Sequence, residues 1–174
     1  SDMFHLKAIE LISKNLRDAV AEAKSGVPAS GREGMALAQY VAGMGFSNVG
    51  LGIDHSMAHT LSAHYDTPHG VACAMLLPIA MEFNKPVVAD RLADVARAMG
   101  VDTTGMSTEE AADAAIAAVR QLSEDVEIPK TCADLVEGDL EQLACDAMAD
   151  ACFPGNPREA DHDQVVELFR KIMA

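Results

Sequence analysis

Four of the six histidines of this chain fall at positions 55, 59, 64 and 69. His55 and His59 are four residues apart, so a helix would place them on one face. His69 follows Thr67-Pro68, a pattern typical of a helix N-terminus, where the macrodipole favours the neutral imidazole that binds metals. Imidazoles from two adjacent helices can converge on one ion. The spacing therefore indicates a metal-dependent enzyme.

The other polar residues near this stretch are weaker candidates. A mixed set of histidine and carboxylate ligands with an open position suits Lewis-acid catalysis, and Asp54 and Asp66 are the nearby carboxylates. Asp54 points about 100° away from its neighbour His55 on a helix, so we expect it to support a ligand or to lie at the surface. His64 is expected at the rim, and His5 and His162 on the surfaces of amphipathic helices. Histidine pairs at this spacing also occur as exposed or hydrogen-bonded residues without any metal.

Size and composition narrow the fold class. With 174 residues the chain is long enough for one domain, 1–174, with its own core. It is 49% hydrophobic but only 4% aromatic, has no Trp, and is dominated by Ala, Leu and Met, which favours packed helices over strands. We predict an all-α domain.

Charge and cysteines restrict partners and location. The formal net charge of −14 argues against a nucleic-acid partner, which would require a basic face. The four cysteines form no CxxC pair, as expected for free thiols in the cytoplasm. No uninterrupted apolar run reaches the roughly 18 residues of a membrane span, and the first residues lack a signal-peptide pattern. We therefore expect a cytoplasmic protein with neither a membrane nor a nucleic-acid partner.

The apolar periodicity and breaker residues predict about eight helices and no strand. Pro78 is expected to kink one helix, and 25–31 is expected to be a loop. Ser47, Thr67, Ser107 and Asp161 are the predicted N-caps, with a capping box at Ser107-Thr-Glu-Glu110. The predicted helices span about 2–24, 32–45 (buried), 47–65, 67–84, 86–99, 107–126, 139–151 and 162–173.

Longer motifs surround these histidines. They are Gly43-Met-Gly-Phe-Ser-Asn-Val-Gly-Leu-Gly52, His55-x-Met-Ala-His59, Thr67-Pro-His-Gly-Val-Ala72, Leu76-Leu-Pro78 and Gly155-Asn-Pro-Arg-Glu-Ala160. Together they closely resemble the signature region and carboxy-terminal loop of the iron-containing (group III) alcohol dehydrogenases, and the similarity extends over essentially the whole chain. Within that family the chain looks most similar to the lactaldehyde reductase (1,2-propanediol oxidoreductase) branch.

The resemblance implies the all-helical, dehydroquinate synthase-like domain of a two-domain, NAD-dependent enzyme. In that family one Asp and three His hold a divalent metal, Fe²⁺ or in some members Zn²⁺, and two of these histidines match His55 and His69. His59 matches a catalytic histidine beside the nicotinamide and substrate, where it assists proton transfer and cofactor positioning. Phe46 and Cys152 would line the substrate pocket. The resemblance further implies small alcohol or diol and aldehyde substrates and a homo-oligomer.

The chain also departs from the family pattern. The amino-terminal nucleotide-binding domain and the Asp and first His ligands do not occur in these 174 residues. We therefore expect a fragment of a two-domain enzyme that binds metal weakly and is inactive alone.

Two alternatives follow. One is a zinc-dependent glycerol dehydrogenase or dehydroquinate synthase-like enzyme, against which the uninterrupted motifs at 46–52 and 155–159 argue. The other is a free-standing helical module that binds a metal or a partner without catalysis.

Overall fold

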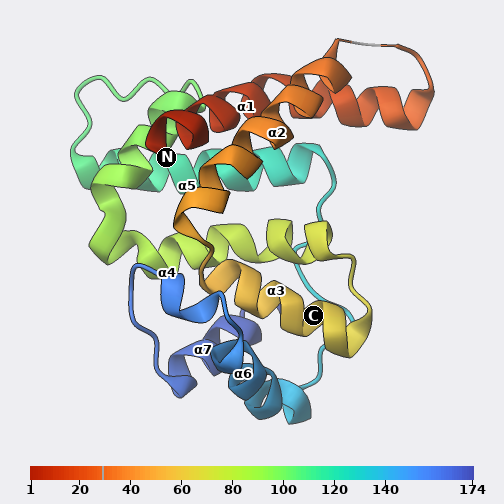
Figure 1. The fold of residues 1–174 in the computed structure, drawn as a ribbon, viewed down its shortest axis with the longest axis vertical. Helices are drawn as coiled ribbons and strands as arrows, with labels where there is room; N and C mark the ends of the chain where they lie inside the picture. Colours follow the sequence, from red (N-terminus) through yellow and green to blue (C-terminus); the bar gives the residue numbers. More distant parts are fainter. Residues whose placement is uncertain (29) are drawn as a thin grey trace. The chain divides into compact units, whose positions relative to one another are not determined.

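The structure is a computed structural model that describes residues 1–28 and 30–174 (Figure 1). The described residues contain no strand, only an isolated bridge between Cys132 and Met173, so the all-helical class is confirmed. The predicted loop 25–31 includes residue 29, which lies outside the described residues. The helices are α1 (Asp2–Ser25), α2 (Gly31–Val49), α3 (Ile53–Tyr65), α4 (His69–Ala98), α5 (Thr108–Asp125), α6 (Leu140–Ala149) and α7 (His162–Arg170), with short 3₁₀ helices η1 (Glu137–Asp139) and η2 (Phe153–Gly155).

The chain divides into two compact units, each built from two segments of sequence. Unit 1 comprises Ser1–Val49 and Val88–Glu127, and unit 2 comprises Gly50–Val87 and Ile128–Ala174. All the histidines of the predicted site fall in unit 2. The predicted single domain stays a prediction.

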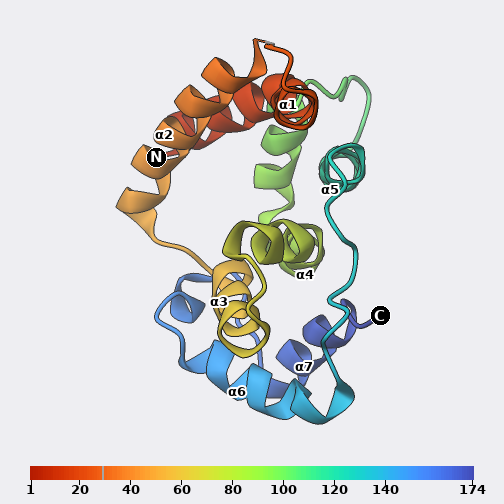
Figure 2. The same ribbon diagram turned by 90° about the vertical axis from the view of Figure 1, so that its right-hand side faces the viewer.

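In unit 1, α1 and α2 lie side by side, as both ribbon views show (Figures 1 and 2). Gly45 permits this approach, because a Cβ at this position would overlap the ring of His5. The prediction of a buried helix at 32–45 is wrong: Tyr40 is 64% exposed, and along α2 only Gly31, Ala38 and Gly45 are buried. α5 begins with the predicted capping box, in which Glu110 N–H donates to Ser107 Oγ at 3.2 Å.

Two predicted helix starts are shifted. Ser47 lies inside α2, because that helix continues to Val49, and Gly52 is the residue that precedes α3. α4 begins at His69, and the amides of Val71 and Ala72 donate to the carbonyl of Pro68 at 2.9 and 3.0 Å. The predicted N-cap of the last helix is confirmed, since Asp161 and Gln164 form a second capping box at the start of α7, but the helix ends at Arg170 and not at 173.

α4 combines two predicted helices. The kink predicted at Pro78 is wrong: the one residue inside α4 with non-helical backbone is Val88 (φ −135°, ψ 24°), two residues after Pro86. Proline removes one backbone donor and its ring clashes with the preceding turn, which explains a break near Pro86. By length and composition alone, α4 is the one helix of the described residues that could span a membrane. Several apolar side chains of its first part belong to the core of unit 2.

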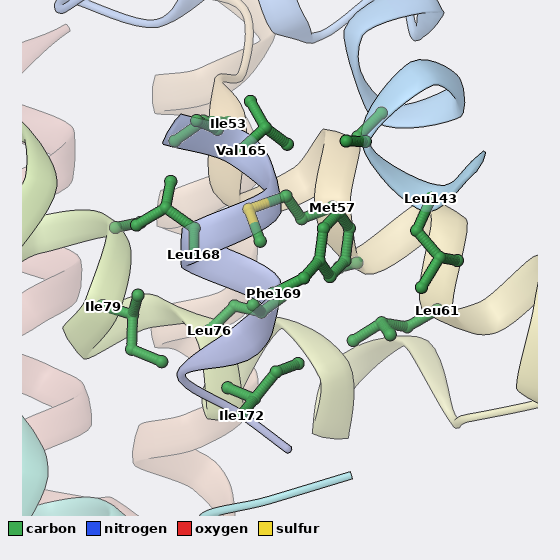
Figure 3. Packing of buried hydrophobic residues seen from close by; sticks show 14 of the residues in the cluster. Ile53, Met57, Leu61, Leu76, Ile79, Leu143, Val165, Leu168, Phe169 and Ile172 are labelled. Atoms are coloured by element: carbon green, nitrogen blue, oxygen red, sulfur yellow. The ribbon is translucent and has the colours of Figure 1, made fainter. Parts of the chain in front are cut away.

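The core of unit 2 surrounds Phe169 of α7, which is fully buried (Figure 3). Side chains from α3, α4, α6 and α7, and one that follows α7, pack together there: Ile53, Met57, Leu61, Leu76, Ile79, Leu143, Val165 and Leu168 from the helices, and Ile172 after α7. On α3 the buried residues at 53, 57 and 61 share one face. Positions 55 and 59 are about 200° around the helix from 53 and 57. The packing of α3 therefore leaves His55 and His59 on the face that points away from the core.

Candidate functional site

Three histidine rings lie together in unit 2. His55 and His59 come from α3, and His69 is the first residue of α4. Their ring centroids are 6.1 Å apart for His55 and His59, 5.5 Å for His55 and His69, and 5.2 Å for His59 and His69. Two adjacent helices thus bring three imidazoles to one place, as the spacing in the sequence predicts.

A thiol and a carboxylate lie beside His55. Cys73, one turn after His69 on α4, has its Sγ 3.6 Å from His69 Nε2. The possible ligand atoms of His55, His69 and Cys73 all lie within 4.8 Å of one another. Asp54 Oδ2 is 3.5 Å from His55 Nδ1, and only 17% of the Asp54 side chain is exposed. Nitrogen and sulfur donors of three residues therefore lie close together, with a carboxylate next to His55.

Burial controls protonation in this cluster. It lowers the pKa of His55, and the neighbouring His69 and His59 lower it further, so the ring is neutral at pH 7. Burial raises the pKa of Asp54 to about 7, although the contact with Cys73 offsets part of the rise. Burial and the nearby Asp54 raise the pKa of the Cys73 thiol to about 12. Neutral imidazole is the form that binds a metal ion.

His59 has its own partners at the C-terminal end of α6. Its Nδ1 is 3.0 Å from Asp150 Oδ2, and the Asp150 Oδ1 accepts a hydrogen bond from the Cys152 backbone N–H at 2.8 Å. Burial alone would raise the pKa of Asp150, but these hydrogen bonds lower it overall. Donor atoms of His59, Asp150 and Cys152 form a second group within 4.8 Å.

The loop after η2 holds the start of α3. Asn156 Oδ1 accepts hydrogen bonds from the Ile53 N–H at 3.3 Å and from Asn84 Nδ2 at 3.0 Å. Asn156 Nδ2 donates to Asn84 Oδ1 at 2.8 Å and to the Arg158 carbonyl at 2.6 Å. A Cβ at Gly155 would overlap the Leu51 carbonyl oxygen, so this close approach requires glycine. The Gly155–Arg158 motif therefore fixes the helix that carries His55 and His59.

Of the predicted site residues, unit 2 brings together His55, His59, His69 and Cys152. Phe46 lies in unit 1 on α2 and is 43% exposed. The functional roles of all five stay predictions. His64 is exposed and 2.8 Å from Asp146, away from the three rings, in line with a rim position.

Asp150 and Cys73 are not among the site residues predicted from the sequence. The sequence held a signal for Cys73, because it follows His69 by four residues on one helix and so shares its face. Asp150 carried no such signal, since it lies 91 residues after His59 and the two meet only through the packing of α3 against α6.

The donor set fits a divalent metal ion. Zinc and iron accept imidazole nitrogen, and zinc also accepts thiolate sulfur. Within unit 2 the partly buried ring of His55 and the exposed ring of His69 are neighbours, and Cys73 completes a group of three possible ligands. The cluster can hold an ion and leave a coordination position open.

Comparison with known proteins gives consistent results. A family model described as "Fe-containing alcohol dehydrogenase family, C-terminal" matches residues 1–173. Lactaldehyde reductase of Escherichia coli (strain K12) is 51% identical over 171 residues, covering 97% of this chain and 44% of that protein. A more distant relative, 34% identical over 175 residues (99% of this chain, 45% of the relative), is named NAD-dependent methanol dehydrogenase of Bacillus methanolicus.

A solved structure agrees with the fold. The crystal structure of a 1,3-propanediol oxidoreductase superposes with a TM-score of 0.91 at 42% identity, covering 96% of this chain and 44% of that one. The chain thus spans less than half the length of the relatives it matches.

Proposed function

This chain belongs to the Fe-containing alcohol dehydrogenase family, and from that premise we propose that it is the metal-binding part of an NAD-dependent oxidoreductase that interconverts small alcohols or diols and aldehydes. One observation carries the proposal: three imidazoles from α3 and α4 converge with ring centroids 5.2–6.1 Å apart. The names of the relatives support this substrate class and the use of NAD.

His55 and His69 are the proposed ligands of a divalent ion, Fe²⁺ by family and Zn²⁺ as the alternative. A bound ion would act as a Lewis acid on the oxygen of the alcohol or aldehyde. Burial lowers the pKa of His55, which favours the unprotonated ring that an ion can bind. Two histidines alone give weak affinity for Fe²⁺.

His59 is the proposed proton-transfer residue. The pKa of Asp150 is lowered, so its carboxylate is ionised and can only accept hydrogen bonds. The His59 Nδ1 therefore carries the hydrogen that Asp150 accepts, and Nε2 keeps a lone pair. Nε2 can then take the proton of an alcohol in one direction and return it in the other.

The remaining assignments complete the proposal. Cys152, beside His59, and Phe46 are proposed to line the substrate pocket. NAD accepts the hydride. We propose that it binds mainly outside this chain, in a region that corresponds to the unmatched part of the relatives, with His59 close to the nicotinamide. We assign the enzyme to the cytoplasm as a homo-oligomer without a membrane or nucleic-acid partner, in keeping with the net charge of −14.

Metal titration of this chain tests the site. Fe²⁺ under anaerobic conditions and Zn²⁺ are titrated into the parent chain and into a His55→Ala, His69→Ala double variant. The double variant should lose at least about tenfold in affinity, because both proposed ligands are gone. The matched control is His64→Ala, His162→Ala, which removes two histidines outside the cluster and should bind as the parent does. Equal binding by the parent and the His55, His69 variant would place the metal elsewhere.

Activity is measured on the protein as its gene encodes it, through NADH formation with small alcohols and diols. The double variant should have no measurable turnover and the control variant full turnover. The chain of 174 residues alone should be inactive.

A further inference from the structure

A thiol stands beside the two proposed metal-binding histidines. Cys73 lies one helical turn after His69 on α4, so both side chains project from the same face. The Cys73 Sγ is 3.6 Å from His69 Nε2, and one donor atom from each of His55, His69 and Cys73 lies within 4.8 Å of the other two. No metal role follows for Cys73 from the family resemblance.

These separations suit tetrahedral coordination. Zinc binds sulfur at about 2.3 Å and imidazole nitrogen at about 2.0–2.1 Å, so ligands at the tetrahedral angle have sulfur and nitrogen about 3.6 Å apart. The observed distance between Cys73 Sγ and His69 Nε2 has this value. An ion could therefore bind between them without displacement of α4.

Two of the other cysteines, Cys132 and Cys145, lack these surroundings, and Cys152 belongs to the separate group with His59 and Asp150. Cys132 is buried and belongs to the apolar core of unit 2. Cys145 is exposed and also lies 3.6 Å from a histidine nitrogen, His162 Nε2, but it belongs to no group of three possible ligands among the described residues. Cys145 is therefore a matched control: it has the same cysteine–histidine contact without the second imidazole.

Resting on the metal role proposed above for His55 and His69, we infer that Cys73 is a third, thiolate ligand of the same ion. As the metal–sulfur bond forms, the S–H bond breaks and its proton passes to solvent. In this chain the resulting set of two nitrogens and one sulfur favours Zn²⁺ over Fe²⁺. The helical part of the enzyme can thus hold zinc with its own side chains.

Cobalt spectroscopy tests the inference on this chain. Co²⁺ is titrated under reducing conditions into the parent, Cys73→Ser, Cys73→Ala and Cys145→Ser, and Zn²⁺ affinity is then measured by competition. The parent and Cys145→Ser should develop the near-ultraviolet charge-transfer absorption of a cobalt thiolate. Both Cys73 variants should lack it and bind Zn²⁺ at least about tenfold more weakly. Far-UV circular dichroism verifies that each variant is folded.

The outcomes separate the two proposals. If the parent binds Co²⁺ without charge-transfer absorption, or if the Cys73 variants keep the absorption, the inference is wrong, while the role of His55 and His69 stands. If the parent binds no ion, three donors do not suffice and the inference is also wrong. If the His55→Ala, His69→Ala variant binds like the parent, the metal site of the proposed function itself fails.

Discussion

Asp150 contacts the ring of His59, although the two residues are 91 positions apart in the sequence. The Asp150 Oδ2 is 3.0 Å from His59 Nδ1, and the Cys152 backbone N–H fixes the other carboxylate oxygen at 2.8 Å. The carboxylate cannot rotate without losing one of these bonds. In the reaction proposed above, Asp150 therefore acts through the orientation and tautomer of His59.

Asp150→Asn should reduce kcat/KM of the gene-encoded enzyme by about 10- to 100-fold. The amide can offer an N–H to Nδ1 in place of an acceptor, and this favours the tautomer without a free Nε2 lone pair. Metal content should not change, and long-range ¹H–¹⁵N spectra of this chain should show the tautomer shift. The control is Asp146→Asn, which alters the 2.8 Å contact with His64 outside the cluster. Equal activity of the two variants would refute the role of Asp150.

Asn156→Ala should destabilise unit 2 by about 1–3 kcal/mol, because its hydrogen bonds to Ile53, Asn84 and Arg158 are partly buried. Chemical denaturation measures the loss, and the imidazole resonances of His55 and His59 should shift as the start of α3 loosens. Asn48→Ala, which removes one exposed hydrogen bond to the Met44 carbonyl, should change stability by less than about 0.5 kcal/mol. A similar loss in both variants would contradict the anchoring role of Asn156.

Phe169→Ala should lower the free energy of unfolding by about 3–5 kcal/mol, since the ring is fully buried among side chains of four helices. Phe169→Leu should cost less, because it leaves a smaller cavity. The free energy of unfolding is measured by denaturant titration. Val136→Ala, at a position 52% exposed in the same unit, should stay within about 0.5 kcal/mol of the parent. The Phe169 prediction fails if its variant behaves like that control.

The Tyr65 hydroxyl should lose its proton at a higher pH than an ordinary tyrosine. Burial and the Asp139 carboxylate, which accepts the Tyr65 hydroxyl at 2.6 Å, raise the pKa of Tyr65 to about 12. The folded state thus keeps this proton longer than the unfolded chain, whose tyrosines titrate near pH 10. The stabilising contribution is complete below about pH 10 and is lost as the pH rises towards 12.

Tyrosinate absorbance measures this titration, and Tyr65→Phe should remove the late step. The stability difference between the parent and this variant should shrink between pH 10 and 12. A constant difference across that range would contradict the assignment.

The helical fold was largely predictable because its signals are local. The capping boxes at Ser107 and Asp161 and the apolar period of α3 depend on residues within one or two turns. The predictions of helix boundaries and burial were wrong where tertiary contacts determine them. Ser47 is a good N-cap by type, yet α2 continues through it, and Pro78 is accommodated in α4 whereas the break falls at Val88. The apolar composition of α2 predicts a buried helix, although Tyr40 is exposed.

The candidate site was predictable only in part. His55, His59 and His69 belong to adjacent helices, so their spacing predicts their meeting. Asp150 reaches His59 through the packing of α6 on α3, which no periodicity encodes. The burial of Asp54, which raises its pKa to about 7, likewise depends on the surroundings that the fold provides.

Because unit 2 is built from two separate segments of sequence, the ribosome synthesises its two parts at different times. Residues 88–127 of unit 1 separate the helix that carries His59 from the segment that carries Asp150 and Phe169. At about 5–20 residues per second a ribosome needs roughly 5–20 s to pass from position 59 to position 150. During that interval α3 has neither its core partner nor the carboxylate that orients His59. The proposed metal ligands His55 and His69 are thus synthesised well before the pair of His59 and Asp150 can form.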